Sequence, residues 1–299
     1  MRIAIIIPAF NEEDLIGQTL ESLARQTYLP TQIIVVDDNS TDDTFQIAES
    51  FQDRLPIKIV RNKSTAENIP GAKVINAFKK GLELINLTEF EIICKFDSDL
   101  IFPDDYLEVM IASFNTSSSL SMNSSATGNK TVDEKVGMVA GYCTVLKDGV
   151  WKIENQNNPD HIRGALKAYH IECFKDIGGL KSSIGWDTID EMLARYFGWK
   201  VVTISNLYVK HLKPTGSSYK PNSMQLQGEA FYKMRYGLSL TAITAFKMAA
   251  KKKKTRLFLD YLKGYFKAQK NGLEPLLTKD QGRFLRSYRW NGIRSRFGF

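Results

Sequence analysis

Long apolar runs are missing from this sequence. No window approaches the roughly 18 consecutive apolar residues that a membrane-spanning helix needs, so we expect no transmembrane helix. The apolar stretch at residues 3–7 is too short for the hydrophobic region of a signal peptide, and it runs directly into the polar segment Asn11–Asp14. We therefore expect residues 3–7 to form a buried strand rather than a targeting peptide.

Cysteine is scarce. The three cysteines, Cys94, Cys143 and Cys173, are odd in number and lack the spacing of metal ligands. A disulfide framework is therefore not expected, and reduced thiols in a cytoplasmic protein are the interpretation that fits.

A glycine-rich phosphate loop is also absent. Dinucleotide-binding folds place Gly-x-Gly-x-x-Gly directly after the first strand, where the backbone approaches a pyrophosphate. This chain instead has Pro8-Ala9-Phe10-Asn11-Glu12-Glu13, which argues against a dehydrogenase. A turn from strand to helix still presents free N–H groups and a positive helix end to a ligand. The alternative for this segment is structural, with Asn11 capping the helix and the two glutamates in its first turn.

Positive charge is present but concentrated at one end. The net charge is +7, yet residues 240–299 hold 15 Lys/Arg against 3 Asp/Glu, whereas the remaining residues hold 25 against 30. The basic character is thus a property of the C-terminal tail. Such a tail can meet anionic lipid, nucleic acid or only water, and no nucleic-acid partner is expected because the tail contains no known reader motif.

Short apolar runs alternate with segments of helical periodicity. Strands are predicted at residues 3–7, 33–36, 57–61, 90–96, 136–140 and 200–204, and helices at 15–23, 71–87 and 187–197. This alternation predicts an α/β fold with a mostly parallel mixed sheet flanked by helices. Ligands of such sheets bind beyond the carboxyl ends of the strands. We therefore expect Asn11, Asp38 and the Asp97–Asp99 group to converge on one crevice.

Two acidic motifs follow predicted strands. Asp38 closes the second strand, where its carboxylate can accept a hydrogen bond from a uracil N–H or a ribose hydroxyl; Asx turns are the alternative for Asn39–Asp43. Asp97-Ser98-Asp99 puts two carboxylates where they can converge on a hard cation through oxygen ligands. Such a cation would hold a diphosphate and neutralise its charge. Taken alone, the Asp-x-Asp pair is a weak signal, because this pattern is more often an ordinary turn.

Together these segments resemble the family 2 glycosyltransferases of the GT-A fold. The likeness covers roughly residues 1–212 and rests on Pro8–Glu13, Val35–Asp43 and Asp97–Asp99, in the order and at the spacing of that family. By that resemblance the second strand's Asp38 would contact the base. The residues that the resemblance assigns to the nucleotide are Pro8, Ala9, Asn11, Glu12, Asp38, Lys73 and Asp97.

The same resemblance assigns Asp97, Asp99 and His211 to a divalent cation, Mn²⁺ or Mg²⁺. Asp99 would be the firmer ligand. His211 fits the place, just past the last core strand, where many GT-A enzymes have a histidine that touches the metal or the diphosphate. The alternative for His211 is a packed or surface residue, with Lys210 or Lys213 meeting phosphate instead.

Family members usually open a late helix with Glu-Asp, and the aspartate is the catalytic base. Here Asp187 takes the place of that aspartate and Trp186 replaces the glutamate. Asp187 is therefore the expected base, with Glu191 and Asp190 in reserve one helical turn further on, and Trp186 is expected to stack on the acceptor. The alternative for Asp187 is a helix N-cap.

The resemblance implies an inverting, metal-dependent glycosyltransferase, which moves a sugar from a nucleotide-diphosphate donor, expected to be UDP-linked, to an acceptor hydroxyl in a polysaccharide or glycolipid. Inversion is expected because no second carboxylate is assigned as a nucleophile. One alternative, suggested by Trp186, is a non-catalytic relative that binds nucleotide sugars or glycans. The other is a sugar-phosphate nucleotidyltransferase, which shares the architecture but usually has a Gly-rich basic loop after the first strand.

We expect a GT-A catalytic domain at residues 1–212, with a flexible Ser/Asn-rich loop at 115–131, and a basic helical extension at 213–299. Leu257–Phe266 places apolar residues along one helical face, and lysines lie on or beside the other. Such a helix favours peripheral contact with an anionic membrane, here the inner face. The alternative is that the tail helices cover the acceptor cleft or a dimer partner.

Overall fold

The computed structural model describes residues 1–64, 71–115, 135–154, 161–213 and 223–295. The strands are β1 Ile3–Ala9, β2 Gln32–Asp38, β3 Ile57–Asn62, β4 Ile92–Phe96, β5 Leu100–Ile101, β6 Val136–Lys147, β7 Val150–Ile153, β8 Leu166–His170 and β9 Lys200–His211. The helices of the sheet layers are α1 Ile16–Ala24, α2 Thr44–Glu49, α3 Ala72–Leu82, α4 Tyr106–Asn115, α5 Ile171–Asp176 and α6 Trp186–Tyr196, with a 3₁₀ turn at Leu87–Glu89. The C-terminal helices are α7 Ser223–Lys233, α8 Leu238–Lys251, α9 Arg256–Lys270 and α10 Lys279–Arg294.

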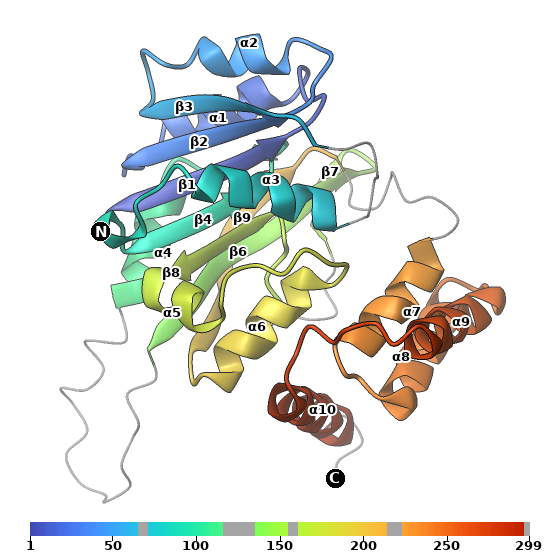
Figure 1. The fold of residues 1–299 in the computed structure, drawn as a ribbon. Helices are drawn as coiled ribbons and strands as arrows, with labels where there is room; N and C mark the ends of the chain where they lie inside the picture. Colours follow the sequence, from blue (N-terminus) through green and yellow to red (C-terminus); the bar gives the residue numbers. More distant parts are fainter. Residues whose placement is uncertain (65–70, 116–134, 155–160, 214–222, 296–299) are drawn as a thin grey trace, which may run out of the picture.

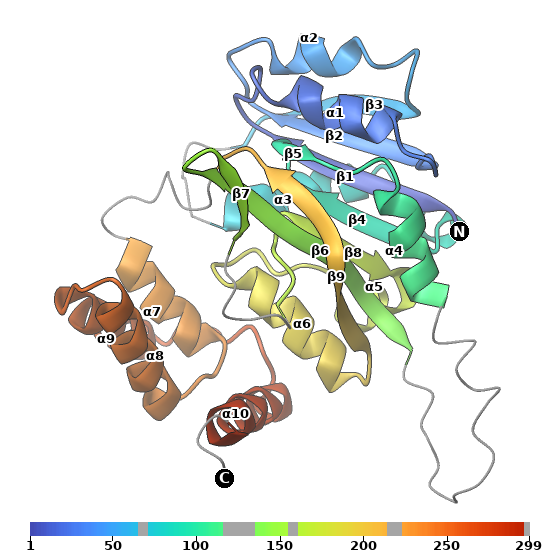
Figure 2. The same cartoon turned by 180° about the vertical axis from the view of Figure 1, so that it is seen from behind.

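One mixed sheet forms the centre of the molecule. Its order is β3-β2-β1-β4-β8-β6-β9-β5, with β7 paired to β6. Helices α3, α5 and α6 cover the face seen in Figure 1, and α1 and α4 cover the opposite face seen in Figure 2. The expected α/β fold, a mixed sheet flanked by helices, is confirmed.

Strand direction differs between the two halves of the sheet. β3, β2, β1 and β4 are parallel neighbours, as the alternation of strands and helices predicts. In the second half β8 is antiparallel to β4 and β6, and β7 is antiparallel to β6. Antiparallel strands need only a short turn between them. Asp148 and Gly149 supply that turn between β6 and β7, since both have positive φ, the conformation of a tight hairpin.

The central strands are apolar because both faces of the sheet are covered. Every residue of β1 is buried, and six of the seven in β2 are buried. α1 buries Ile16, Leu20 and Leu23, which recur at helical spacing and face this sheet. The last residues of β1 and β2 therefore emerge from a fixed hydrophobic layer, and the polar residues that follow are held at one edge.

Several predicted boundaries move. The helix expected at 71–87 ends at Leu82, and the strands expected at 136–140 and 200–204 extend to Lys147 and His211. Polar residues that break the apolar pattern in β6 and β9 are held in strand conformation by their mutual pairing, which sequence periodicity cannot reveal. Of the loop expected at 115–131, Asn115 ends α4 and the remainder lies outside the described residues.

Helices α7 and α9 cross at two glycines. A Cβ atom on Gly228 would lie 1.9 Å from the carbonyl oxygen of Tyr261, and one on Gly264 would lie 1.9 Å from that of Gln225. This close approach buries part of the apolar face that the sequence singles out on the tail. Tyr261 is 3% exposed and stacks on Phe231 of α7 at 5.8 Å between ring centroids. Contact with other helices thus accounts for most of that face.

α10 returns to the sheet domain and packs against α6. Its Phe284 ring lies 5.6 Å from that of Tyr196, and Arg195 lies 5.5 Å from the ring centroid of Tyr288. Among the described residues, no helix is both long and apolar enough to cross a membrane. The division at residues 212 and 213 stays a prediction, because the helices on its far side contact α6.

Candidate active site

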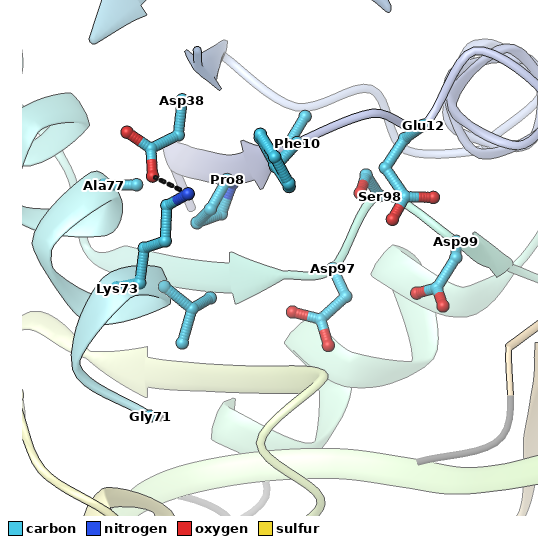
Figure 3. Close-up of a pocket in the computed structure, with 12 residues that line it drawn as sticks. Pro8, Phe10, Glu12, Asp38, Gly71, Lys73, Ala77, Asp97, Ser98 and Asp99 are labelled. Atoms are coloured by element: carbon cyan, nitrogen blue, oxygen red, sulfur yellow. Dashed lines mark ion pairs between the residues drawn. The ribbon is translucent and has the colours of Figure 1, made fainter. Parts of the chain in front are cut away.

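A cavity of about 360 Å³ lies beyond the carboxyl ends of β1, β2 and β4 (Figure 3). Its walls come from four places: the end of β1 with the loop after it, the last residue of β2, the start of α3 and the turn after β4. The expected site residues that line it are Pro8, Ala9, Glu12, Asp38, Lys73, Asp97 and Asp99. The structure therefore brings these residues to one crevice, while their binding roles stay predictions.

Asp38 is fixed at one side of this cavity. It ends β2 and is 3% exposed, and its Oδ1 accepts a hydrogen bond of 2.8 Å from the Nδ2 of Asn62, which ends the neighbouring strand β3. Lys73, in the first turn of α3, approaches Oδ2 at 3.7 Å and lies 4.0 Å above the Phe10 ring. The result is a buried carboxylate beside a cation and an aromatic ring, an arrangement that can bind a polar, planar base with its ribose.

Asn11 has a different place from the one expected. It does not line the cavity, and its side-chain oxygen accepts a 2.9 Å hydrogen bond from the backbone N–H of Thr41. Its φ of 52° lies in the left-handed region, which asparagine tolerates better than most residues. Asn11 does not cap α1 either, because that helix begins at Ile16 with Leu15 before it. Asn11 instead joins the loop after β1 to the loop after β2.

Asp97, Asp99 and His211 form a cluster at the other side of the cavity. Their ligand atoms lie within 4.8 Å of one another. The pairing of β5 with β9 sets Leu100 opposite His211, which brings the imidazole to the turn that carries both aspartates. His211 Nε2 lies 3.3 Å from Asp99 Oδ2. Two carboxylates and an imidazole fit a divalent cation such as Mn²⁺ and also accommodate Mg²⁺.

Glu154 holds the other side of the His211 ring. Its Oε2 lies 3.2 Å from Nδ1, and Arg163 approaches the same oxygen at 3.3 Å. Burial disfavours the charged imidazole, but the contacts with Asp99 and Glu154 outweigh it and raise the pKa of His211 to about 9. A carboxylate on the second ring nitrogen is the usual partner of a metal-ligating histidine, because it fixes the orientation of the ring.

Glu12 reaches the cavity from the loop after β1. Burial raises its pKa above the ordinary value, and the nearby carboxylates of Asp97 and Asp99 act in the same direction. Lys213, just past β9, opposes this shift with a hydrogen bond of 2.7 Å to Glu12. This ion pair links the loop after β1 to the end of β9 beside the aspartates.

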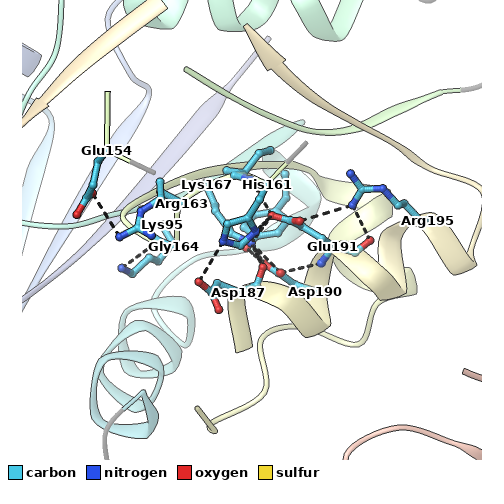
Figure 4. A network of polar contacts seen from close by, with 12 residues as sticks. Lys95, Glu154, His161, Arg163, Gly164, Lys167, Asp187, Asp190, Glu191 and Arg195 are labelled. Atoms are coloured by element: carbon cyan, nitrogen blue, oxygen red, sulfur yellow. Dashed lines mark hydrogen bonds and ion pairs between the residues drawn. The ribbon is translucent and has the colours of Figure 1, made fainter. Parts of the chain in front are cut away.

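Asp187 belongs to a second polar cluster, at the N-terminus of α6 (Figure 4). The helix N-cap is Gly185, so the N-cap interpretation of Asp187 is wrong. His161 Nε2 lies 3.6 Å from Asp187 Oδ2. Burial opposes ionisation of this carboxyl, but His161 and the charge of Lys167 outweigh it and lower the pKa of Asp187 to about 2. Asp187 is therefore an ionised carboxylate at neutral pH.

The two reserve candidates lie deeper. Lys167 is fully buried and donates to Asp190 at 2.7 Å and to Glu191 at 3.3 Å. The hydroxyl of Tyr169 also donates to Asp190, and the backbone N–H of Ile162 donates to Glu191. The side chains of Asp190 and Glu191 are 2% and 4% exposed, compared with 31% for Asp187. Asp187 is thus the carboxylate of the three that a substrate can reach most easily.

Trp186 fills the space between the two clusters. It is 7% exposed, and the ammonium groups of Lys95 and Lys167 each lie 5.4 Å from the centre of its ring system. Lys95 also contacts Asp97 and donates to the carbonyl of Gly164. Such burial favours a role in positioning the two lysines. The expected stacking of Trp186 on an acceptor sugar stays a prediction.

The sequence patterns did not indicate several members of these clusters, among them Lys95, Glu154, His161 and Lys167. Lys95 and Lys167 interrupt apolar strands, and a lysine at a buried strand position signals a partner carboxylate. No comparable signal marks Glu154 or His161, because their partners are distant in the sequence.

Comparisons with known proteins point to one family. The family model described as "Glycosyl transferase family 2" matches residues 4–174. A validoxylamine A glucosyltransferase from Streptomyces hygroscopicus subsp. limoneus is 37% identical over 73 residues, which are 24% of this chain and 16% of that enzyme. The chain thus matches only a small part of the length of this curated relative.

Solved structures share the fold. Residues 1–349 of TarS from Staphylococcus aureus, in complex with UDP-GlcNAc, match with a TM-score of 0.54 and 19% identity, covering 95% of this chain and 78% of that one. The mannosyltransferase PcManGT from Pyrobaculum calidifontis, in complex with GDP-Man and Mn²⁺, matches with a TM-score of 0.52 and 18% identity, covering 77% and 62%. The expected GT-A fold is thereby confirmed.

Proposed function

The chain belongs to glycosyl transferase family 2, and we propose that it transfers a sugar from a nucleotide-diphosphate donor to an acceptor hydroxyl. The observation that carries the proposal is the cavity that has Asp38 at one side and Asp97 and Asp99 at the other. The first carboxylate suits a nucleoside, and the second pair suits a metal-bound diphosphate.

Metal dependence rests on the chemistry of the ligands. Asp97, Asp99 and His211 would hold Mn²⁺ or Mg²⁺, and Glu154 would orient the imidazole. When bound, such a cation neutralises negative charge on the departing diphosphate. Glu12 and Lys213 lie beside the proposed metal site. The ammonium group of Lys213 can stabilise the negative charge that develops on the leaving group.

Asp187 is the proposed base. Its ionised carboxylate takes the proton of the acceptor hydroxyl while the acceptor oxygen attacks the anomeric carbon of the sugar. The nucleoside diphosphate departs from the opposite side of that carbon. A single displacement of this kind inverts the anomeric configuration. Asp190 and Glu191 are engaged by buried Lys167, so they are poorly placed to act as a nucleophile for a double displacement.

A UDP-linked donor is proposed because Asp38 can accept from the uracil N–H, and because a structural neighbour of this chain was solved with UDP-GlcNAc. The acceptor is proposed to be a glycan or a lipid-linked glycan. Residues 1–212 would carry catalysis, and residues 213–299 would form the helical extension of a cytoplasmic, membrane-peripheral enzyme.

Titration calorimetry with UDP in the presence of Mn²⁺ tests the site. Asp99→Ala should weaken UDP binding by at least about tenfold, a change of about 1.4 kcal/mol, because the diphosphate loses its metal bridge. Asp104→Ala is the matched control: this exposed aspartate pairs with Arg25 at 3.3 Å, lies outside the cavity and should bind UDP normally.

The nucleotide is tested separately by thermal shift with UDP-, GDP-, dTDP- and CMP-sugars and Mn²⁺. The correct donor binds only the folded state and should raise the melting temperature. Unchanged UDP affinity in Asp99→Ala would remove the metal assignment, and a larger shift with GDP-sugars would replace the proposed donor.

A further inference from the structure

The α8–α9 hairpin has an unusual charge. Residues 238–270 contain nine Lys/Arg and one acidic residue, Asp260. Four of the basic residues, Lys251–Lys254, lie at the end of α8 and in the connection to α9, and all four are exposed. Asp260 is paired with Arg256 at 4.0 Å, so it does not neutralise the positive charge of Lys251–Lys254.

The same hairpin exposes large apolar side chains. Phe246 is 69% exposed, which is the highest value among the large hydrophobic side chains of the described residues. Leu259, Phe266 and Ile243 are 54%, 47% and 41% exposed. Exposed apolar residues scattered singly need no explanation, but these four lie on two helices that pack against each other.

These residues follow helical stripes. On α8, Ile243, Phe246 and Ala250 are spaced i, i+3 and i+7, which puts them on one side of the helix. On α9, Leu259 and Phe266 are spaced i and i+7, with Lys263 between them. The opposite side of α9 is covered by α7, where the two glycines cross. We call the uncovered residues of both helices, together with Lys251–Lys254, the hairpin face.

The hairpin face overlaps the surface that the sequence pattern indicates at Phe266 but is centred elsewhere. That pattern centres on Tyr261, which is buried against α7. In both views, α7, α8 and α9 lie on the side of the molecule away from the N-terminus, the side toward which β1 and β2 run (Figures 1 and 2). The carboxyl ends of these strands, where the cavity lies, are therefore on the same general side of the molecule as the hairpin.

We propose that the hairpin face binds the surface of an anionic lipid bilayer. Lysines attract the anionic headgroups, and the exposed apolar side chains enter the boundary between headgroups and acyl chains. Nucleic acid would engage the lysines but give Phe246 and Leu259 no apolar partner. A second copy of the chain would bring the same dense positive charge together, which is unfavourable.

The test is co-sedimentation of the full chain with vesicles. Phosphatidylcholine vesicles containing about one third phosphatidylserine should pellet the chain at low salt, and pure phosphatidylcholine vesicles should not. Raising the salt from about 0.1 M to about 1 M shortens the screening length from about 10 Å to about 3 Å and should release the protein. Replacing Lys251–Lys254 with glutamine should weaken vesicle binding by more than about tenfold, since each lysine near the membrane surface contributes about fivefold to the affinity.

A matched pair of substitutions tests the apolar contribution. Phe246→Ser should weaken vesicle binding roughly tenfold, because the ring no longer enters the bilayer. Leu29→Ser is the control: Leu29 is 54% exposed but precedes β2, far from the hairpin in the sequence and outside the hairpin face. Both variants should keep the parent melting temperature, since neither side chain is buried.

Three outcomes overturn the proposal. The first is failure of the full chain to bind anionic vesicles at low salt. The second is equal binding by the Phe246→Ser and parent chains, together with competition by duplex DNA, which would indicate a purely electrostatic surface. The third is a dimer in sedimentation velocity that Phe246→Ser dissociates, which would make the face a self-association site. None of these bears on donor binding, so the proposed sugar transfer is tested independently, whereas the membrane-peripheral placement in the proposed function rests on this same vesicle test.

Discussion

At the scale of single residues, Asp187 and Glu191 lie one turn apart on α6 but have different surroundings. We predict that Asp187→Asn lowers kcat by about 10²–10⁴-fold and leaves the affinity for UDP and Mn²⁺ unchanged, because a base acts only in the transition state. Glu191→Gln should mainly destabilise the fold, by about 1–3 kcal/mol, because it removes a charged partner of buried Lys167.

Steady-state kinetics and urea unfolding on the same two variants separate these effects. Normal turnover by Asp187→Asn, combined with a stable but inactive Glu191→Gln, would transfer the role of base to Glu191. The parent protein assayed in the same buffers is the reference for both measurements.

His161 gives the second cluster a distinctive pH dependence. Burial lowers the pKa of this imidazole, but Asp187 and Glu191 outweigh burial and raise it to about 9. A histidine whose pKa rises on folding contributes stability that is fully present below its unfolded value, near 6.5, and is lost as the pH rises through about 9. We predict that the unfolding free energy of the parent falls over this range relative to that of His161→Gln.

Urea unfolding from pH 6 to pH 9.5 measures that difference. The comparison must be made between parent and variant, because His211 has a similarly raised pKa and contributes to both proteins alike. A constant difference across the range would mean that folding does not shift the pKa of this imidazole.

The sequence predicted which residues converge on the cavity where local chemistry was sufficient. Asp38, Asp97 and Asp99 each follow a buried strand, and parallel strands bring such ends together. The contacts of His161 with Asp187, of Glu154 with His211 and of Lys167 with Asp190 join residues that are distant in the sequence, and only the assembled fold shows them. Asn11 was assigned to the nucleotide, whereas its observed contacts are with the loop after β2.

At the scale of elements, apolar runs predicted the parallel half of the sheet well, because a strand covered on both faces is continuously apolar. The antiparallel half was predicted less completely. β8 contains the buried Lys167, which breaks its apolar pattern, and its assignment depends on pairing with β4 and β6. The Asp148-Gly149 turn was a usable hairpin signal in the sequence.

The crossing of α7 and α9 depends on glycine. We predict that Gly228→Ala destabilises the protein by at least about 1–3 kcal/mol, because the added Cβ would overlap a backbone carbonyl that cannot rotate away. Gly292→Ala is the matched control in α10: nothing lies within 4 Å of its added Cβ, so alanine should be neutral or stabilise by about 0.5–1 kcal/mol.

Urea unfolding midpoints of the two alanine variants test this prediction. Equal midpoints would mean that α7 and α9 separate without cost in solution. Loss of vesicle binding in Gly228→Ala with donor affinity retained would further indicate that the crossing supports the hairpin face alone.

At the scale of the whole molecule, the helical extension contacts the sheet domain through α6. One side of this helix carries Asp187, Asp190 and Glu191, and its last turn meets α10 through Tyr196 and Arg195. The cavity is built differently, since all the described residues that line it lie between Pro8 and Asp99. Donor binding and catalysis should therefore depend on the extension to different degrees.

We predict that a chain ending at residue 213 keeps its affinity for UDP and Mn²⁺ within about threefold, or about 0.6 kcal/mol, but loses most of its turnover. Without α10 the last turn of α6 is uncovered, so residues 186–196 should exchange their amide hydrogens faster, and Asp187 should be held less firmly. Hydrogen exchange followed by mass spectrometry measures the exchange rates of these amides directly.

A full-length protein with Phe284→Ala and Tyr288→Ala lacks the same contacts and is the control if the short chain folds poorly. It should show the same faster exchange in α6. Unchanged exchange in α6 together with full turnover would instead make residues 1–212 an autonomous enzyme and limit the extension to binding surfaces.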